Sequence, residues 1–134
     1  MNEEANLQTV HRFYQTASDG DLPAMLKLIA DDVDWKDAGA DRLPWTIPVH
    51  GRKEFEQYGK AIFEALEFQA FQPDEFIVGR DAVVVLGHER CLVRATGRVV
   101  EANWAQIFTL REGLICKFRE YSDTAAWEAG VAKR

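Results

Sequence analysis

The stretch GLICKFREYSD, residues 113–123, starts at a glycine turn and then alternates with the period of two typical of a β-strand. One face of this strand carries Glu120 among mostly apolar side chains, namely Leu114, Cys116, Phe118 and Ser122. We predict that this face points into the protein. A carboxylate there must be paired, hydrogen-bonded or protonated, and such a group is a candidate general base or acid. The alternative is a strand end with Glu120 at the solvent rim, paired with an arginine.

Three more long strands precede this one, and helical patterns dominate the first half of the chain. The predicted strands are joined by short turns and span residues 68–78, 82–94 and 99–110. Apolar periodicity and capping residues predict helices at residues 4–18, at 52–66 and at 124–132, and a further helix that begins at Asp21. A short strand at 33–37 and a loop at 38–50 lie between the second and third of these helices along the chain.

Helices followed by long antiparallel strands indicate an α+β fold. We expect a single domain over residues 1–134, a cone-shaped roll with a curved, mostly antiparallel sheet wrapped by three N-terminal helices around a pocket. The chain of 134 residues is 47% hydrophobic, enough to bury a core of this kind. Concave, mainly apolar pockets are common sites for small ligands.

The bulk properties of the chain exclude several classes of partner. A net charge of −6 without a basic stripe argues against nucleic acid and anionic membranes. No apolar run reaches membrane-spanning length and the first residues do not resemble a signal peptide, so we expect a cytoplasmic protein. Cys91 and Cys116 have no metal-binding spacing and fit a reducing compartment. We expect neither a metal nor a cofactor.

Because side chains alternate between the two faces of a strand, a few polar residues should share the face that lines the predicted pocket. Trp35 and Asp37 are two residues apart and face the same way, as do Trp104 and Gln106. With Glu120, these residues would give the pocket two carboxylates, one amide and two indoles. Each also has a structural alternative: Asp37 as a turn residue, the tryptophans as core or pocket wall, and Gln106 as a satisfied amide.

Charged residues also gather on the predicted strand at 82–94. His88 and Arg90 share one of its faces, and Glu89 lies on the other. Arg90 could pair with Glu120 and keep that carboxylate ionised. The alternative is that these charges sit on a solvated outer face of the sheet.

The sequence resembles proteins of the nuclear transport factor 2-like superfamily over nearly its whole length. The resemblance rests on VHRFY at residues 10–14, GDLP at 20–23, LIADDVDW at 28–35, PVHGRKEF at 48–55 and the stretch 113–123. The last two are similar to segments of SnoaL-like proteins and of limonene epoxide hydrolases. This superfamily hosts many activities on one cone-shaped fold.

The resemblance to limonene epoxide hydrolase implies roles for particular residues. Its two water-positioning residues fall on Trp35 and Asp37, its arginine on Arg90 and its base on Glu120. Its second acidic residue falls on Leu92, unless a shift in register gives that role to Glu89. The acid expected to protonate the leaving oxygen is therefore missing from the aligned position.

The resemblance to ketosteroid isomerase implies a different assignment. The general base falls on Asp37, the oxyanion-binding tyrosine on Phe13 with Tyr14 adjacent, and the protonated aspartate on Gln106. A glutamine can still donate to an oxyanion, whereas Phe13 cannot. SnoaL-like polyketide cyclases use a carboxylate for acid–base chemistry in the same pocket without a cofactor.

From these patterns we expect cofactor-free acid–base chemistry of the isomerase, cyclase or hydrolase type on a small apolar molecule. The alternative is a ligand-binding or accessory dimerisation module without turnover. The candidate catalytic residues are Glu120, Asp37 and Arg90, and the candidate ligand-binding residues are Trp35, Tyr14, Phe13, Trp104, Gln106 and Phe118. We also expect a homodimer that pairs through the outer sheet face and covers the apolar run 82–86.

Overall fold

The four long strands that the sequence predicts form most of one six-stranded sheet. The computed structural model describes residues 2–39, 43–45 and 48–132. The strand order is β2-β1-β6-β5-β4-β3, and of these pairs β1 and β6 run parallel while the others run antiparallel. The strands span Ile29–Lys36 (β1), Val49–His50 (β2), Leu66–Val78 (β3), Ala82–Val93 (β4), Arg98–Arg111 (β5) and Leu114–Ser122 (β6).

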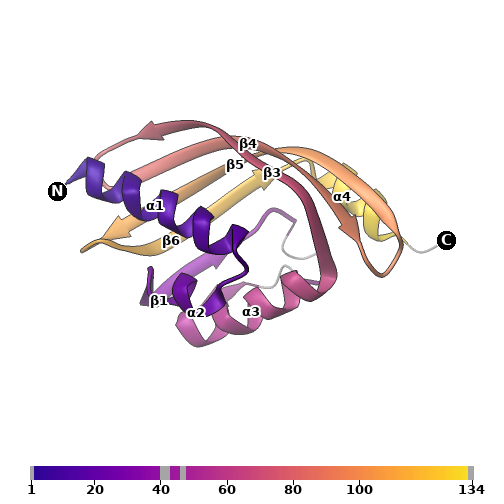
Figure 1. Cartoon of the computed structure of the whole chain (residues 1–134), viewed down its shortest axis with the longest axis horizontal. Coiled ribbons are helices and arrows are strands. Elements are labelled where there is room, and N and C mark those ends of the chain that lie inside the picture. Colours follow the sequence, from indigo (N-terminus) through magenta and orange to yellow (C-terminus); the bar gives the residue numbers. More distant parts are fainter. Residues whose placement is uncertain (1, 40–42, 46–47, 133–134) are drawn as a thin grey trace.

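The helices begin and end close to their predicted positions and surround the concave side of the sheet. They span Glu3–Ser18 (α1), Leu22–Leu26 (α2), Arg52–Ala65 (α3) and Thr124–Val131 (α4). Asp21 caps α2 as predicted, because its side chain accepts a hydrogen bond from the backbone of Ala24 at 3.1 Å. α3 packs on β1, and α4 packs on β5 at the end of the sheet opposite the N-terminus (Figure 1).

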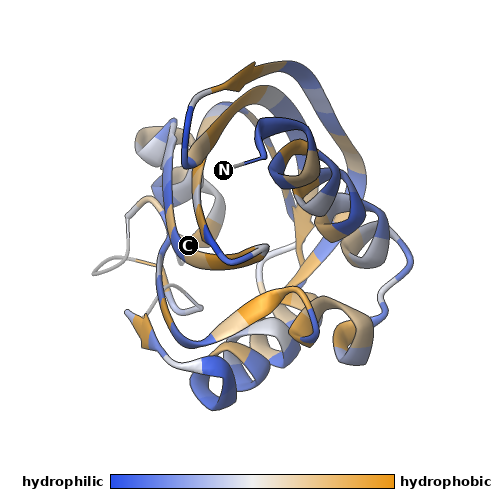
Figure 2. Ribbon diagram, turned by 90° about the vertical axis from the view of Figure 1, so that its left-hand side faces the viewer, coloured by the Kyte–Doolittle hydropathy of each residue, from blue (hydrophilic) through white to orange (hydrophobic). Residues whose placement is uncertain are grey.

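Strong curvature turns the sheet into an open cone with α1 lying across its concave side (Figure 2). Its pairing register shifts at four places: between Ile29 and Asp34 on β1, between Phe68 and Ala70 and between Pro73 and Glu75 on β3, and between Thr109 and Leu110 on β5. Extra residues of this kind bend a strand and increase its twist. The bulges therefore account for much of the curvature that leaves room inside.

The bulge between β5 and β6 corrects one prediction for the last strand. Thr109 lies opposite Lys117, whereas the next residue, Leu110, lies opposite Ile115. Cys116 is the extra residue, so the alternation predicted from Leu114 onward breaks there, and Ile115 is buried instead of its neighbours. Beyond the bulge the prediction is correct: Phe118 and Glu120 both line the interior.

A close approach between β4 and β5 explains the glycine in the middle of β4. Gly87 lies directly opposite Trp104, and a Cβ atom on this glycine would meet the indole of Trp104 at 2.4 Å. Only a residue without a side chain allows the indole to lie over the β4 backbone at this point. The large ring therefore packs flat inside the cone.

The segment between Trp35 and α3 differs most from its prediction. β1 starts four residues earlier than the predicted strand at 33–37, and the predicted loop at 38–50 contains β2. Residues 40–42 and 46–47 of that loop lie outside the described residues. In the described part of the chain, no helix combines the length and apolar character needed to cross a bilayer.

Candidate functional site

The concave side of the sheet encloses a cavity of about 950 Å³. Aromatic rings from the sheet, α1 and α3 form much of its wall: Phe13, Tyr14, Trp35, Tyr58, Phe71 and Phe118. Exposed residues also belong to the wall, among them Asp19 at the end of α1 and Glu67 on β3. The cavity therefore opens to solvent between α1 and β3.

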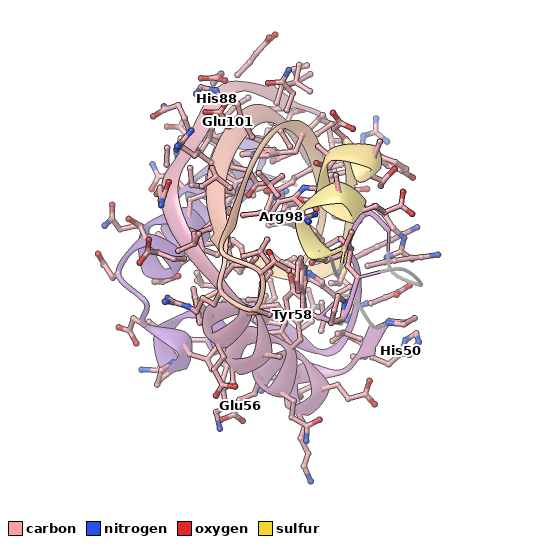
Figure 3. The ribbon with its side chains drawn as sticks, turned by 90° about the vertical axis from the view of Figure 1, so that its right-hand side faces the viewer. His50, Glu56, Tyr58, His88, Arg98 and Glu101 are labelled. Atoms are coloured by element: carbon pink, nitrogen blue, oxygen red, sulfur yellow. The ribbon has the colours of Figure 1, made fainter. Side chains whose placement is uncertain are left out.

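Asp37 follows directly after β1, and its carboxylate is buried in the cavity wall. The phenol of Tyr58 donates a hydrogen bond to Oδ2 of Asp37, and Nε1–H of Trp35 donates to Oδ1 at 3.2 Å. Figure 3 shows Tyr58 pointing from α3 towards the interior. Both carboxylate oxygens are thus held by neutral donors, which orient the group without neutralising its charge.

Glu120 lies on β6 directly opposite Gln106 on β5. Nε2 of Gln106 donates to Oε2 of Glu120 at 2.7 Å, and the hydroxyl of Tyr14 donates to Oε1 of Gln106, also at 2.7 Å. Glu120 keeps part of its surface accessible and lines the cavity, so the accessible part faces the cavity. A chain of hydrogen bonds therefore runs from α1 through the amide to the carboxyl group.

Glu89 is a third carboxylate in the same wall. It points inward from β4 with an exposed fraction of 6%. The thiol of Cys91 contacts Oε1 of Glu89 at 3.6 Å, which is a weak interaction because a thiol is a poor donor. Its cross-strand neighbours, Phe71 on β3 and Ala102 on β5, have no polar side-chain atoms.

These environments separate the proton affinities of Asp37 and Glu120. Burial raises the pKa of Asp37 to about 6, and the hydrogen bonds from Tyr58 and Trp35 limit that rise. Burial, followed by the negative charges of Asp37 and Glu89, raises the pKa of Glu120 well above its usual value. With a pKa of about 6, Asp37 is therefore mainly ionised at neutral pH, whereas Glu120 holds its proton more tightly than an ordinary glutamate does.

The groups around the two carboxylates also have shifted proton affinities. Burial raises the pKa of Glu89 to about 7, the Cys91 thiol opposes that rise, and the charge of Asp37 adds to it. Burial, and then the charge of Glu120, raises the pKa of Tyr14. Burial and Asp37 likewise raise the pKa of Tyr58. Both phenols remain protonated near neutral pH and can act only as neutral donors or acceptors.

Most of the predicted ligand-binding residues lie together. Phe13, Tyr14, Trp35, Gln106 and Phe118 all line the cavity with Asp37 and Glu120. The rings of Trp35 and Phe118 stack with their centroids 3.8 Å apart and an angle of 11° between their planes. This stacked pair forms part of the apolar wall of the cavity.

The prediction for Trp104 is wrong in detail. Its side chain is buried on the inner face of β5, as parity predicts, but it does not form part of the cavity wall. The ring of Phe71 stacks on it with centroids 4.8 Å apart, and Phe71 itself lines the cavity. Trp104 therefore supports the wall from behind.

The prediction that Arg90 pairs with Glu120 is also wrong. Arg90 lies on the outer face of β4, where it donates to Glu101 at 2.5 Å and to Gln69 at 2.9 Å. Figure 3 shows Glu101 at the periphery, far from Tyr58 in the interior. Arg90 and Glu120 lie on opposite faces of the sheet, so the alternative of a solvated outer face holds for Arg90 and His88.

Two residues of the site were not among the predicted site residues. Glu89 shares its strand face with Val83, Val85 and Cys91, which are fully buried, so the period of two carried the signal for its burial. Tyr58 lies on the apolar stripe of α3, and its hydroxyl reaches Asp37 across 21 residues of sequence. No local pattern in the sequence encodes that contact.

Comparisons with known proteins agree with this architecture. Residues 10–118 match the SnoaL-like domain family. A solved NTF2-like protein from Burkholderia xenovorans is 26% identical, with a TM-score of 0.90 over 98% of this chain and 99% of that one. An NTF2-like protein of unknown function from Burkholderia pseudomallei is also 26% identical, with a TM-score of 0.87 over 99% of this chain and 100% of the other.

A third solved structure is similar in fold alone. It is a protein from Jannaschia provisionally named a SnoaL-like polyketide cyclase, and it is 19% identical with a TM-score of 0.81 over 98% of this chain and 94% of that one. No curated protein sequence matches the chain.

Proposed function

Because the chain belongs to the family of SnoaL-like domains, we propose that it catalyses cofactor-free proton transfer next to a carbonyl group of a small, mainly apolar molecule. The resulting reaction is an isomerisation or a cyclisation. One observation carries the proposal: two carboxyl groups in different hydrogen-bonded environments, Asp37 held by two donors and Glu120 with its pKa raised well above the usual value, line the same cavity. Separated proton affinities of this kind assign a base and an acid.

In this mechanism Asp37 is the base. Its carboxylate removes a proton from the carbon next to the carbonyl group, and the electron pair of that C–H bond moves towards the carbonyl oxygen. Tyr58 and Trp35 hold Asp37 by hydrogen bonds, which fixes the direction of its oxygens. With a pKa of about 6, this group is ionised near neutral pH and still basic enough to accept a proton.

Glu120 is the acid in the same step. Its proton is donated to the developing enolate oxygen, supported by the hydrogen-bond chain through Gln106 and Tyr14. In an isomerisation, Asp37 then returns its proton to another carbon of the conjugated enol while the enol O–H proton returns to Glu120 and the carbonyl group forms again. In a cyclisation, the enol carbon attacks a second carbonyl group in the same molecule and forms a C–C bond; the enol O–H proton returns to Glu120, and the new alkoxide oxygen takes the proton held by Asp37.

Epoxide opening of the hydrolase type has less support. The arginine that this chemistry would use corresponds to Arg90, which lies on the outer face with Glu101. The indoles and phenyl rings of the wall favour an apolar substrate, and the cavity volume of about 950 Å³ admits a molecule of several fused or linked rings.

Exchange of hydrogen for deuterium tests the proposal without knowledge of the full substrate. A panel of cyclic ketones and 1,3-diketones is incubated with the protein in D₂O, and NMR follows the loss of the signals next to the carbonyl. We expect faster exchange for at least one ring system and its loss in Asp37→Asn. Arg90→Gln, on the outer face, is the matched control and keeps the activity. Ligands that bind without any exchange would support the non-catalytic binding module instead.

A further inference from the structure

The wall of the cavity is acidic from its opening to its interior. Asp19 and Glu67 are exposed residues of the wall, and Asp37, Glu89 and Glu120 lie further inside. Arg94 and His11 are basic residues of the wall, and both are exposed. Among the described residues, no basic side chain shifts the pKa values of the three inner carboxyl groups. An acidic cleft with apolar walls attracts cations and repels anions.

The three inner carboxyl groups differ in how well the protein satisfies them. Both oxygens of Asp37 accept hydrogen bonds, from Tyr58 and Trp35. Glu120 accepts one from Gln106 and another from the backbone of Ala38. Glu89 is 94% buried, but within the part of the chain that the structure describes it receives only the long contact from the Cys91 thiol, and its cross-strand neighbours cannot donate. A buried carboxylate that faces a cavity with so weak a partner has acceptor capacity left for a ligand.

The surroundings of Glu89 suit an organic cation better than a metal ion. Among residues 2–39, 43–45 and 48–132, no group of three His, Cys, Asp or Glu side chains is arranged to hold a metal. Phe71 lies directly opposite Glu89 on β3 and also lines the cavity. An aromatic face next to a carboxylate is a favourable environment for an ammonium group, which gains from both the charge and the ring.

We propose that the ligand of this cavity carries a protonated amine and that Glu89 receives it. The apolar rings of the ligand then lie along Trp35 and Phe118, and the ammonium group lies between Glu89 and Phe71. This inference names the substrate class of the site described above and so rests on the proposed function. It also separates the roles of the acids, because Glu89 binds whereas Asp37 and Glu120 transfer protons.

Three probes with the same ring system test this inference: 1-naphthylmethylamine, 1-naphthylmethanol and 1-naphthoate. Their binding at pH 8 is measured by isothermal titration calorimetry. We expect the ammonium compound to bind about tenfold to a hundredfold more tightly than the alcohol, and the carboxylate to bind most weakly. Glu89→Gln should remove the preference for the amine and leave the affinity for the alcohol unchanged. Glu101→Gln, on the outer face, should change neither affinity.

The possible outcomes separate this inference from the proposed function. If the alcohol binds as tightly as the amine, or if Glu89→Gln weakens both compounds equally, the amine site is wrong while the acid–base function stands. If the carboxylate binds best, the amine site is also wrong. If none of the three probes binds, the cavity does not accept an apolar ring of this size, and both proposals fall together.

Discussion

Tyr58 on α3 donates its phenolic hydrogen to Asp37 at the end of β1. This contact ties a helix to the sheet and stabilises the ionised form of a buried carboxylate. Burial raises the pKa of Asp37, and the hydrogen bond from Tyr58 is the main influence that opposes the rise. Tyr58 therefore sets the pH range in which Asp37 can accept a proton.

Replacing Tyr58 with phenylalanine should raise the pKa of Asp37 above its value of about 6. The loss of a hydrogen bond to a buried charge should cost about 1–2 kcal/mol of unfolding free energy at pH 8 and less at pH 5, where Asp37 is largely neutral. NMR of ¹³C-labelled aspartate carboxyls measures the pKa, and urea unfolding measures the stability. Tyr121→Phe, which removes the phenolic hydroxyl of an exposed tyrosine on the outer face, is the control for the pKa measurement. An unchanged pKa of Asp37 in Tyr58→Phe would contradict this assignment.

The buried acids should make the protein less stable as the pH rises from about 4 to about 7. Asp37 and Glu89 have folded-state pKa values of about 6 and about 7, above their usual values, so the folded state binds protons more tightly than the unfolded state. Each group then lowers the unfolding free energy by about 1.4 kcal/mol per pH unit between its unfolded and folded pKa values. Urea unfolding at a series of pH values measures this slope.

The variant Glu89→Gln provides the matched test of that slope. The amide cannot ionise, so the decline of stability between pH 4.5 and 7 should become shallower, and the variant should be more stable than the parent at pH 8. Glu101→Gln removes an exposed carboxylate on the other face and should leave the slope intact. A stability that is flat or increases over this range in the parent protein would mean that these acids are not desolvated.

The outer face of the sheet should hold two copies of the chain together. It exposes large apolar side chains at Ile77, Leu86, Val99 and Tyr121. Ile77 is paired with Val84, and Leu86 lies beside Ala105, which in turn faces Tyr121, so several of these residues form a continuous patch. Apolar patches of this kind usually mark an interaction site, and a symmetric dimer is the commonest assembly.

We therefore predict a homodimer at micromolar concentration and its dissociation by Leu86→Glu. A buried glutamate at the centre of the patch would have to be desolvated in each subunit, which should weaken association at least a hundredfold. Analytical ultracentrifugation of both proteins measures this change. Lys53→Glu, which reverses a charge on α3 away from the sheet, should leave the dimer intact. A parent protein that sediments as a monomer would refute the prediction.

Sequence patterning predicted the fold well because most of its signals are local. The period of two along residues 82–94 and 99–110 predicted both strands and which of their side chains point inward. Asp21, a capping residue, correctly predicted the start of α2. The pattern failed where the sheet bends, since the extra residue at Cys116 shifts the faces without a distinctive sequence of its own.

The candidate site was predicted only where strand parity determines it. Parity brought Asp37, Gln106 and Glu120 to one cavity. The alternation of side chains along β4 also assigns Glu89 to the inner face and Arg90 to the outer face. For Arg90, we gave more weight to an expected ion pair with Glu120, and that expectation was wrong. The contact of Tyr58 with Asp37 depends on how α3 docks on β1, which is a property of the tertiary structure.

Glu120→Gln tests the acid of the proposed mechanism and the structural environment of Glu120 together. The amide keeps the shape of the side chain and can still accept a hydrogen bond from Gln106, but it has no acidic proton to deliver. Loss of general acid catalysis should lower the exchange rate about a hundredfold to ten-thousandfold.

The unfolding midpoint of Glu120→Gln should stay the same or rise at pH 8, because Arg90 bonds to Glu101 on the outer face and no guanidinium is left buried. Arg90→Gln should likewise change the stability by no more than about 1 kcal/mol, as expected for a surface pair. If the midpoint temperature of thermal unfolding falls by many degrees in Glu120→Gln, Glu120 is instead a structural residue. If the variant exchanges hydrogen for deuterium at the parent rate, the acid of the mechanism is another group.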